Sequence, residues 1–140
     1  MGLMLDSSIP IAHERRRFDL PGFFHAHPKE TFFIAAITAS ELLHGVERAN
    51  TKTRRAGRSQ YVEDMLVRLA IIDFDLAIAR RHAAIWANLE KRGQIIGAHD
   101  LQIAATAIES GHSVATLNEK EFRRVPDLAL VDVTPFVLRR

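Results

Sequence analysis

The sequence contains no cysteine among its 140 residues, which excludes a disulfide framework and any metal site built on thiolates. It also lacks an apolar run long enough to cross a bilayer. No basic region precedes the first acid, Asp6, so we do not expect a secretory signal at the N-terminus. These absences predict a cytoplasmic protein without a membrane partner.

Net charge is also small, because 19 Lys and Arg residues nearly balance 17 Asp and Glu residues and leave a formal charge of +2. A protein that wraps duplex nucleic acid usually carries a larger excess of positive charge. The basic residues nevertheless gather in short clusters, at 15–17, 52–58, 80–81, 91–92, 123–124 and 139–140. Each cluster is most simply a solvated helix face or end, yet together they allow positive patches beside an acidic centre.

Apolar and polar residues alternate between strand-like and helix-like patterns along the whole chain. We predict strands at 2–5, 32–37, 71–74, 113–116 and 128–131, and helices from about 8, from 38 or 40 to about 50, and at 53–69, 75–91 and 99–109. Phe74 and Trp86 are expected to lie in the core. Alternating strands and helices predict a single α/β domain over 1–140, with a central parallel sheet of about four to five strands flanked by helices.

Acidic residues stand where these predicted elements meet. Asp6 ends the first strand, Glu41 falls in the first turn of the next long helix, and Asp100 opens the alanine-rich helix. Asn118 follows the fourth strand, and Glu121 comes one helical turn later. Because functional groups in parallel sheets gather at the carboxyl ends of the strands, these side chains are candidates for one shared site.

Carboxylates that gather in one place repel one another unless a cation neutralises them. Oxygen ligands suit Mg²⁺ or Mn²⁺, which commonly serve phosphate chemistry. Taken singly, however, an acid at a helix N-terminus is most simply a cap, as we expect for Asp75. The residue types alone therefore leave the choice between metal ligands and helix caps open.

Four short motifs decide between these interpretations. They read MLDSSI at 4–9, ITASELLHGV at 37–46, DLQIAATA at 100–107, and ATLNEKEF at 115–122 followed by RVPDL at 124–128. In this order, and over nearly the whole chain, they resemble the motifs of PIN-domain ribonucleases, the VapC-like toxins of type II toxin–antitoxin systems. One such motif would be weak evidence, whereas four in the family's order are specific.

The resemblance implies a PIN fold and a Mg²⁺- or Mn²⁺-dependent endoribonuclease that cleaves RNA. It also implies a cognate VapB-like antitoxin and a homodimer. Matched position by position, Asp6, Glu41 and Asp100 fall on the family's acidic metal-site residues, and Asn118 falls where relatives carry Asp or Asn. Ser8, Thr116 and Glu121 fall on supporting positions of the same motifs.

The sequence departs from the family pattern at several positions. Ser7 replaces a usual threonine, Pro10 replaces an aliphatic residue, and Asp127 replaces a glycine. Asn118 is neutral, so we expect one firmly held ion and a second ion recruited only with substrate. Two alternatives stay open at this stage: a catalytically silent PIN-fold module that binds RNA or protein, and a nuclease of the same fold that acts on DNA.

Overall fold

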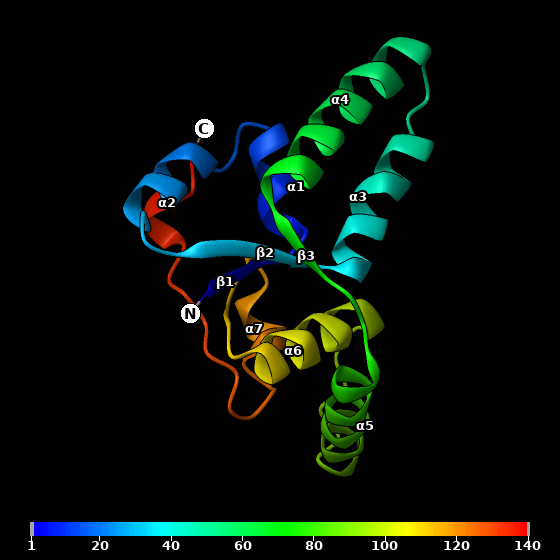
Figure 1. Cartoon of the computed structure of the whole chain (residues 1–140), viewed down its shortest axis with the longest axis vertical. Coiled ribbons are helices and arrows are strands. Elements are labelled where there is room, and N and C mark those ends of the chain that lie inside the picture. The colour runs from blue at the N-terminus through cyan, green and yellow to red at the C-terminus, as the bar shows by residue number, and fades with distance from the viewer. Residues whose placement is uncertain (1, 140) are drawn as a thin grey trace.

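The computed structural model describes residues 2–139, whose helices and strands alternate along the chain (Figure 1). In order, the elements are β1 (Gly2–Leu5), α1 (Ser8–Glu14), α2 (Leu20–Ala26), β2 (Thr31–Ala35), α3 (Ala36–Glu47), α4 (Lys52–Arg68), β3 (Ala70–Ile72), α5 (Leu76–Lys91), α6 (Ala98–Ser110), β4 (Ser113–Ala115), α7 (Glu119–Phe122) and a 3₁₀ turn at Thr134–Phe136. The four strands form one parallel sheet in the order β3-β2-β1-β4. This arrangement confirms the predicted α/β fold.

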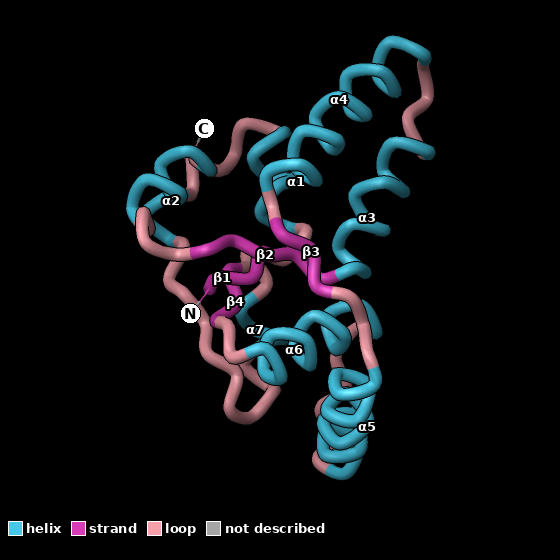
Figure 2. The backbone as a smooth tube through the Cα atoms, in the orientation of Figure 1, coloured by secondary structure: helices cyan, strands magenta, loops and turns pink. Residues whose placement is uncertain are grey.

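Helices cover both faces of the sheet, as Figure 2 shows, and the alternation of side chains along β1 explains why. Leu3 and Leu5 point into one apolar cluster with residues of α1, α2 and α4, whereas Met4 points into a second cluster with residues of α5, α6 and α7. Val114 and Ala115 of β4 divide in the same way between the two clusters. A strand buried on both faces in this way is typical of a parallel sheet between two helical layers.

This topology brings the predicted site residues to one edge of the sheet. β1 lies between β2 and β4, and all three strands run parallel. Their carboxyl ends therefore lie side by side, and the segments that begin with Asp6, with α3 and with Thr116 leave the sheet at the same edge. Because β3 runs parallel to β2, it also ends on this side of the sheet.

Helix ends follow the local sequence signals. Asp75 caps α5, because its side chain accepts a hydrogen bond of 2.9 Å from the Ile78 N–H. Gly111 ends α6 in the left-handed conformation, with φ of 73°. No helix among residues 2–139 is both long enough and apolar enough to span a membrane.

The predicted fifth strand at 128–131 is wrong. Only Leu130 pairs with β4, through hydrogen bonds that join Val114 to Ala129 and Val131 at 2.9 and 3.0 Å. The reason is that β4 is only three residues long and that Asp127, with φ of 66°, turns the chain just before the pairing begins. A single bridge replaces the expected ladder.

Other boundaries and burials also differ from the prediction. Helix α3 begins at Ala36, before the predicted start, so Glu41 lies in its second turn rather than its first. The short helix α2 was missed, although Asp19 accepts a hydrogen bond from the Gly22 N–H and so caps it. Phe74 and Trp86 are not core residues, because 42% and 49% of their surface is exposed.

Candidate active site at the carboxyl edge of the sheet

Asp6 is buried directly after β1 and is held by two hydroxyl groups. Ser8 Oγ and Thr116 Oγ1 both donate to the same carboxylate oxygen, Asp6 Oδ2, at 2.7 and 2.8 Å. Each hydroxyl is oriented in turn by a backbone amide: Leu117 N–H donates to Ser8 Oγ at 3.1 Å, and Asn118 N–H donates to Thr116 Oγ1 at 2.9 Å. Because the hydroxyl protons are committed to Oδ2, the second oxygen of Asp6 is left for another partner.

Asn118 joins two further carboxylates. Its side-chain amide donates to Asp100 Oδ2 at 3.2 Å and to Glu121 Oε2 at 2.8 Å. Asp100 lies in the first turn of α6, and Asn118 precedes α7, so this amide links the starts of two helices. The nitrogen of the Asn118 side chain therefore faces the two acids.

The Asp100 carboxyl group titrates far from its ordinary range. Burial is the main cause, followed by a hydrogen bond to Glu121 and by the negative charges of Asp6, Glu121 and Glu41, and together they raise the pKa of Asp100 from 3.8 to about 7. The pKa of Glu121 is lowered, chiefly by the hydrogen bond from Asn118. A raised pKa of this kind is the physical consequence of burying a carboxyl group among other carboxylates.

Glu41 approaches the same site from α3. Its Oε2 lies 3.3 Å from Nδ1 of His99, the residue before Asp100, whereas its Oε1 is buried without a hydrogen-bond partner among the described residues. A buried carboxylate oxygen with no partner is costly unless a ligand satisfies it. His99 was not predicted as part of the site, because the pair His99-Asp100 was interpreted as a chance neighbourhood in the sequence.

The donor chemistry of this edge fits a hard divalent cation. Asp6, Glu41 and Asp100 offer only oxygen atoms, and their mutual repulsion appears in the raised pKa of Asp100. The buried Oε1 of Glu41, which has no partner among the described residues, also suits a site that binds a cation. In the arrangement described for residues 2–139, no three acidic or histidine side chains are already close enough to enclose a metal ion together.

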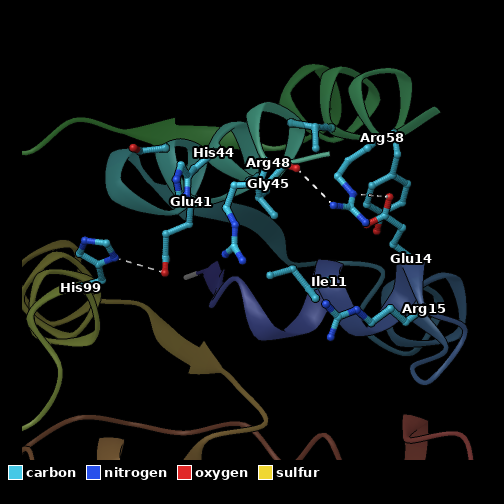
Figure 3. A pocket seen from close by; sticks show the side chains of 13 residues that line it. Ile11, Glu14, Arg15, Glu41, His44, Gly45, Arg48, Arg58 and His99 are labelled. Atoms are coloured by element: carbon cyan, nitrogen blue, oxygen red, sulfur yellow. Dashed lines mark hydrogen bonds and ion pairs between the residues drawn. The ribbon is translucent and has the colours of Figure 1, made fainter. Parts of the chain in front are cut away.

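A pocket with a cavity volume of about 460 Å³ adjoins this acidic cluster. Figure 3 shows Glu41 and His99 at one end, with Arg48 extending into the pocket from the end of α3 and Arg15 from the end of α1. Neither arginine has an ion-pair partner within residues 2–139. Arg58 is different, because it lies 3.5 Å from Glu14 and donates to the Gly45 carbonyl at 3.2 Å.

The pocket thus places two arginines that have no ion-pair partner among residues 2–139 near Glu41 of the acidic cluster. The cluster at 15–17 was noted in the sequence as a local positive patch, but Arg48 carried no signal there. This neighbourhood suits a polyanion whose phosphates contact the arginines while one phosphate reaches the acids.

Comparison with known proteins gives the family. A family model described as PIN domain matches residues 3–128. Ribonuclease VapC1 of Rickettsia felis is 36% identical over 134 residues, which covers 96% of this chain and 98% of that protein. The tRNA(fMet)-specific endonuclease VapC of Salmonella typhimurium is 32% identical over 120 residues, covering 86% of this chain and 83% of that protein.

Solved structures agree with these relatives. The VapBC2 complex of Rickettsia felis, bound to a DNA fragment from its promoter, contains a chain that superposes with a TM-score of 0.85 at 30% identity, covering 94% of this chain and 98% of that chain. A chain of the DNA-bound VapBC complex of Salmonella typhimurium superposes with a TM-score of 0.84 at 28% identity over the same shares. The chain described here therefore belongs to the PIN-domain family and, within it, to the VapC-like ribonucleases.

Proposed function

We propose that this chain is a Mg²⁺- or Mn²⁺-dependent endoribonuclease toxin that hydrolyses RNA phosphodiester bonds and is neutralised by a cognate VapB-like antitoxin. The observation that carries the catalytic proposal is the buried, unpartnered Oε1 of Glu41 beside the crowded carboxylates of Asp6 and Asp100. The relatives named VapC ribonuclease, and the related chains solved as VapBC complexes, support the choice of RNA as substrate and of an antitoxin as partner.

In this proposal Asp6, Glu41 and Asp100 hold the ion, directly or through water. When bound, a divalent ion neutralises the phosphate charge and lowers the pKa of a water molecule that attacks the phosphorus. Ser8 and Thr116 keep Asp6 in one orientation, since each hydroxyl already donates to it. Both hydroxyl protons are therefore committed, which leaves water rather than a side chain as the nucleophile.

Asn118 and Glu121 set the position of Asp100. The Asn118 amide holds Asp100 Oδ2 from one side, and Glu121 accepts a second hydrogen bond from the same amide. Arg15 and Arg48, which extend into the adjoining pocket, are proposed to hold the RNA backbone on one side of the cleaved bond (Figure 3). A single-stranded or loop segment fits this role, because its backbone can bend from the pocket to the acids.

Removal of divalent ions is expected to abolish RNA cleavage, and Mn²⁺ or Mg²⁺ is expected to restore it. The measurement is cleavage of a tRNA pool by the purified chain in EDTA and after each ion is added back, with a single-stranded DNA of matched length in parallel. The matched variants are Glu41→Gln and Glu47→Gln, which change two glutamates of the same helix. Glu47 is 68% exposed and forms only a surface ion pair with Arg55, so its variant should cleave normally.

Three outcomes would count against the proposal. Undiminished cleavage in EDTA contradicts the metal dependence. Cleavage of DNA in preference to RNA contradicts the substrate. Equal activity of Glu41→Gln and Glu47→Gln contradicts the place of Glu41 in the site.

We also propose that the chain forms a homodimer through exposed apolar residues around the edge strand. Val67 and Leu76 are 86% and 66% exposed, and they flank β3, the strand at the edge of the sheet. Phe74 and Trp86 extend this surface, with the His82 ring packed between them at centroid distances of 5.5 and 5.8 Å. Exposed apolar residues grouped in this way are typical of an interaction surface.

A dimer is expected in light scattering at micromolar concentration, and Leu76→Lys should shift it towards the monomer. Leu138→Lys is the control, because Leu138 is 46% exposed near the C-terminus, far along the chain from this surface. A monomeric wild-type chain would contradict the dimer, and a dimer unchanged by Leu76→Lys would contradict the surface.

A further inference from the structure

Thr38 is a buried polar residue that the proposed mechanism does not use. Its side chain is 0% exposed, and its hydroxyl oxygen has no hydrogen-bond partner among residues 2–139. A buried hydroxyl in a helix usually donates to a carbonyl of the preceding turn. Thr106 of α6 does so, at 2.7 Å from the Gln102 carbonyl. The unsatisfied hydroxyl of Thr38 therefore needs an explanation.

Its position on α3 supplies one. Thr38 precedes Glu41 by three residues, and residues at this spacing are neighbours on one face of a helix. The inward oxygen of Glu41, Oε1, is the other buried side-chain atom of α3 without a partner in the described chain. A hydroxyl donor and a carboxylate acceptor, both buried and both unsatisfied, thus occupy neighbouring positions on the same helix.

At the other two carboxylates of the site, a neighbouring side-chain donor orients the carboxylate. Asp6 has one oxygen held by the hydroxyls of Ser8 and Thr116, and Asp100 has one oxygen held by the Asn118 amide. In each case a side-chain donor thus fixes one oxygen of the carboxylate. At Glu41, Nδ1 of His99 lies 3.3 Å from Oε2, whereas Oε1 has no donor within residues 2–139.

We propose that Thr38 is the positioning residue for Glu41, and that its hydroxyl donates to Oε1 when the Glu41 carboxylate binds a divalent ion. This inference rests on the proposed metal site. In the metal-free protein the hydroxyl stays unpaired, so it contributes to metal binding and not to folding. Groups that orient metal ligands in this way typically change metal affinity by about 10–100-fold when they are removed.

The experiment compares Thr38→Val with Thr106→Val, the same substitution at two buried threonines. Mn²⁺ affinity is measured by calorimetry, and the melting temperature is measured in EDTA. We expect Thr38→Val to bind Mn²⁺ roughly 10-fold or more weakly, with a metal-free melting temperature equal to or above that of the wild type. Thr106→Val should do the opposite, because it loses a hydrogen bond that is formed: the melting temperature falls and Mn²⁺ affinity is kept.

Thr38→Ser separates the hydroxyl from the shape of the side chain. If serine keeps wild-type Mn²⁺ affinity while valine loses it, the hydroxyl is the positioning group, even where valine also lowers the melting temperature. Equal Mn²⁺ affinity of wild type and Thr38→Val, or a loss that serine does not restore, overturns the role of Thr38 alone. A wild-type chain that binds no Mn²⁺ overturns the proposed metal site itself, so the two failures are distinguishable.

Discussion

Asp100→Asn is expected to abolish RNA cleavage while the metal-free protein becomes more stable. Asparagine keeps the size of Asp100 but removes the charge that a hard cation requires. A loss of roughly 10²–10³-fold or more in the cleavage rate is expected for the removal of one charged group that stabilises the transition state. Stability should rise because the substitution removes a carboxylate from beside Asp6, Glu41 and Glu121.

The pH dependence of the free energy of unfolding tests how the negative charge of Asp100 affects stability. The folded-state pKa of Asp100, about 7, lies above its ordinary value of 3.8, so the folded protein keeps a proton that the unfolded chain has lost. In EDTA, the free energy of unfolding should therefore fall as pH rises from about 4.5 to about 7. Glu121, whose pKa is lowered, acts in the opposite direction but only below its ordinary value of 4.5. After allowance for solvent screening, we expect the free energy of unfolding to fall by on the order of 1–2 kcal/mol over this pH range. The Asp100→Asn variant should not show this fall.

Asp75→Asn is the matched control, since Asp75 also lies at a helix start and accepts a backbone hydrogen bond. Asparagine caps a helix about as well as aspartate, so this variant should keep both activity and stability. The measurements are cleavage of a tRNA pool and chemical unfolding in EDTA between pH 4.5 and 7.5. If Asp100→Asn cleaves RNA at the wild-type rate, Asp100 is only a helix-start residue.

Asn118→Asp is expected to destabilise the metal-free protein and to make its stability depend strongly on metal. The Asn118 amide donates to Asp100 and to Glu121, and aspartate would replace both donors with a third negative charge. The loss of these hydrogen bonds to charged groups should cost about 2–3 kcal/mol in EDTA. A bound cation should reverse this cost, because an added carboxylate increases the attraction between the site and the ion.

The increase in melting temperature on addition of Mn²⁺ should therefore be larger for Asn118→Asp than for the wild type, and Mn²⁺ affinity should be higher. Asn88→Asp is the control on α5, where Asn88 Oδ1 accepts a hydrogen bond from Arg92 and aspartate can accept it too. The bridging role of Asn118 would be refuted if Asn88→Asp showed the same increase in melting temperature with Mn²⁺ as Asn118→Asp. It would also be refuted if Asn118→Asp were as stable in EDTA as the wild type.

Local sequence was enough to predict the fold class and to single out the candidate acids of the site. The alternation of apolar strands with amphipathic helices depends on residue periods of a few positions, so the parallel α/β arrangement and the edge that holds Asp6 and Asp100 were predictable. The same was true of the caps at Asp75 and Gly111. Where a neighbour in space decided, the prediction was wrong: Leu130 gained one bridge instead of a strand, and Trp86 remained exposed.

The sequence by itself thus determined which carboxylates are candidates for the site, because their motifs are local and lie near the ends of strands or the starts of helices. Only the tertiary structure decided what holds them. Ser8 meets the Leu117 amide across 109 positions of the chain, and Thr116 meets Asp6 across 110. His99 reaches Glu41 from another helix in the same way. No local period encodes such contacts, since they arise from the order in which β1, β2 and β4 pair within the sheet.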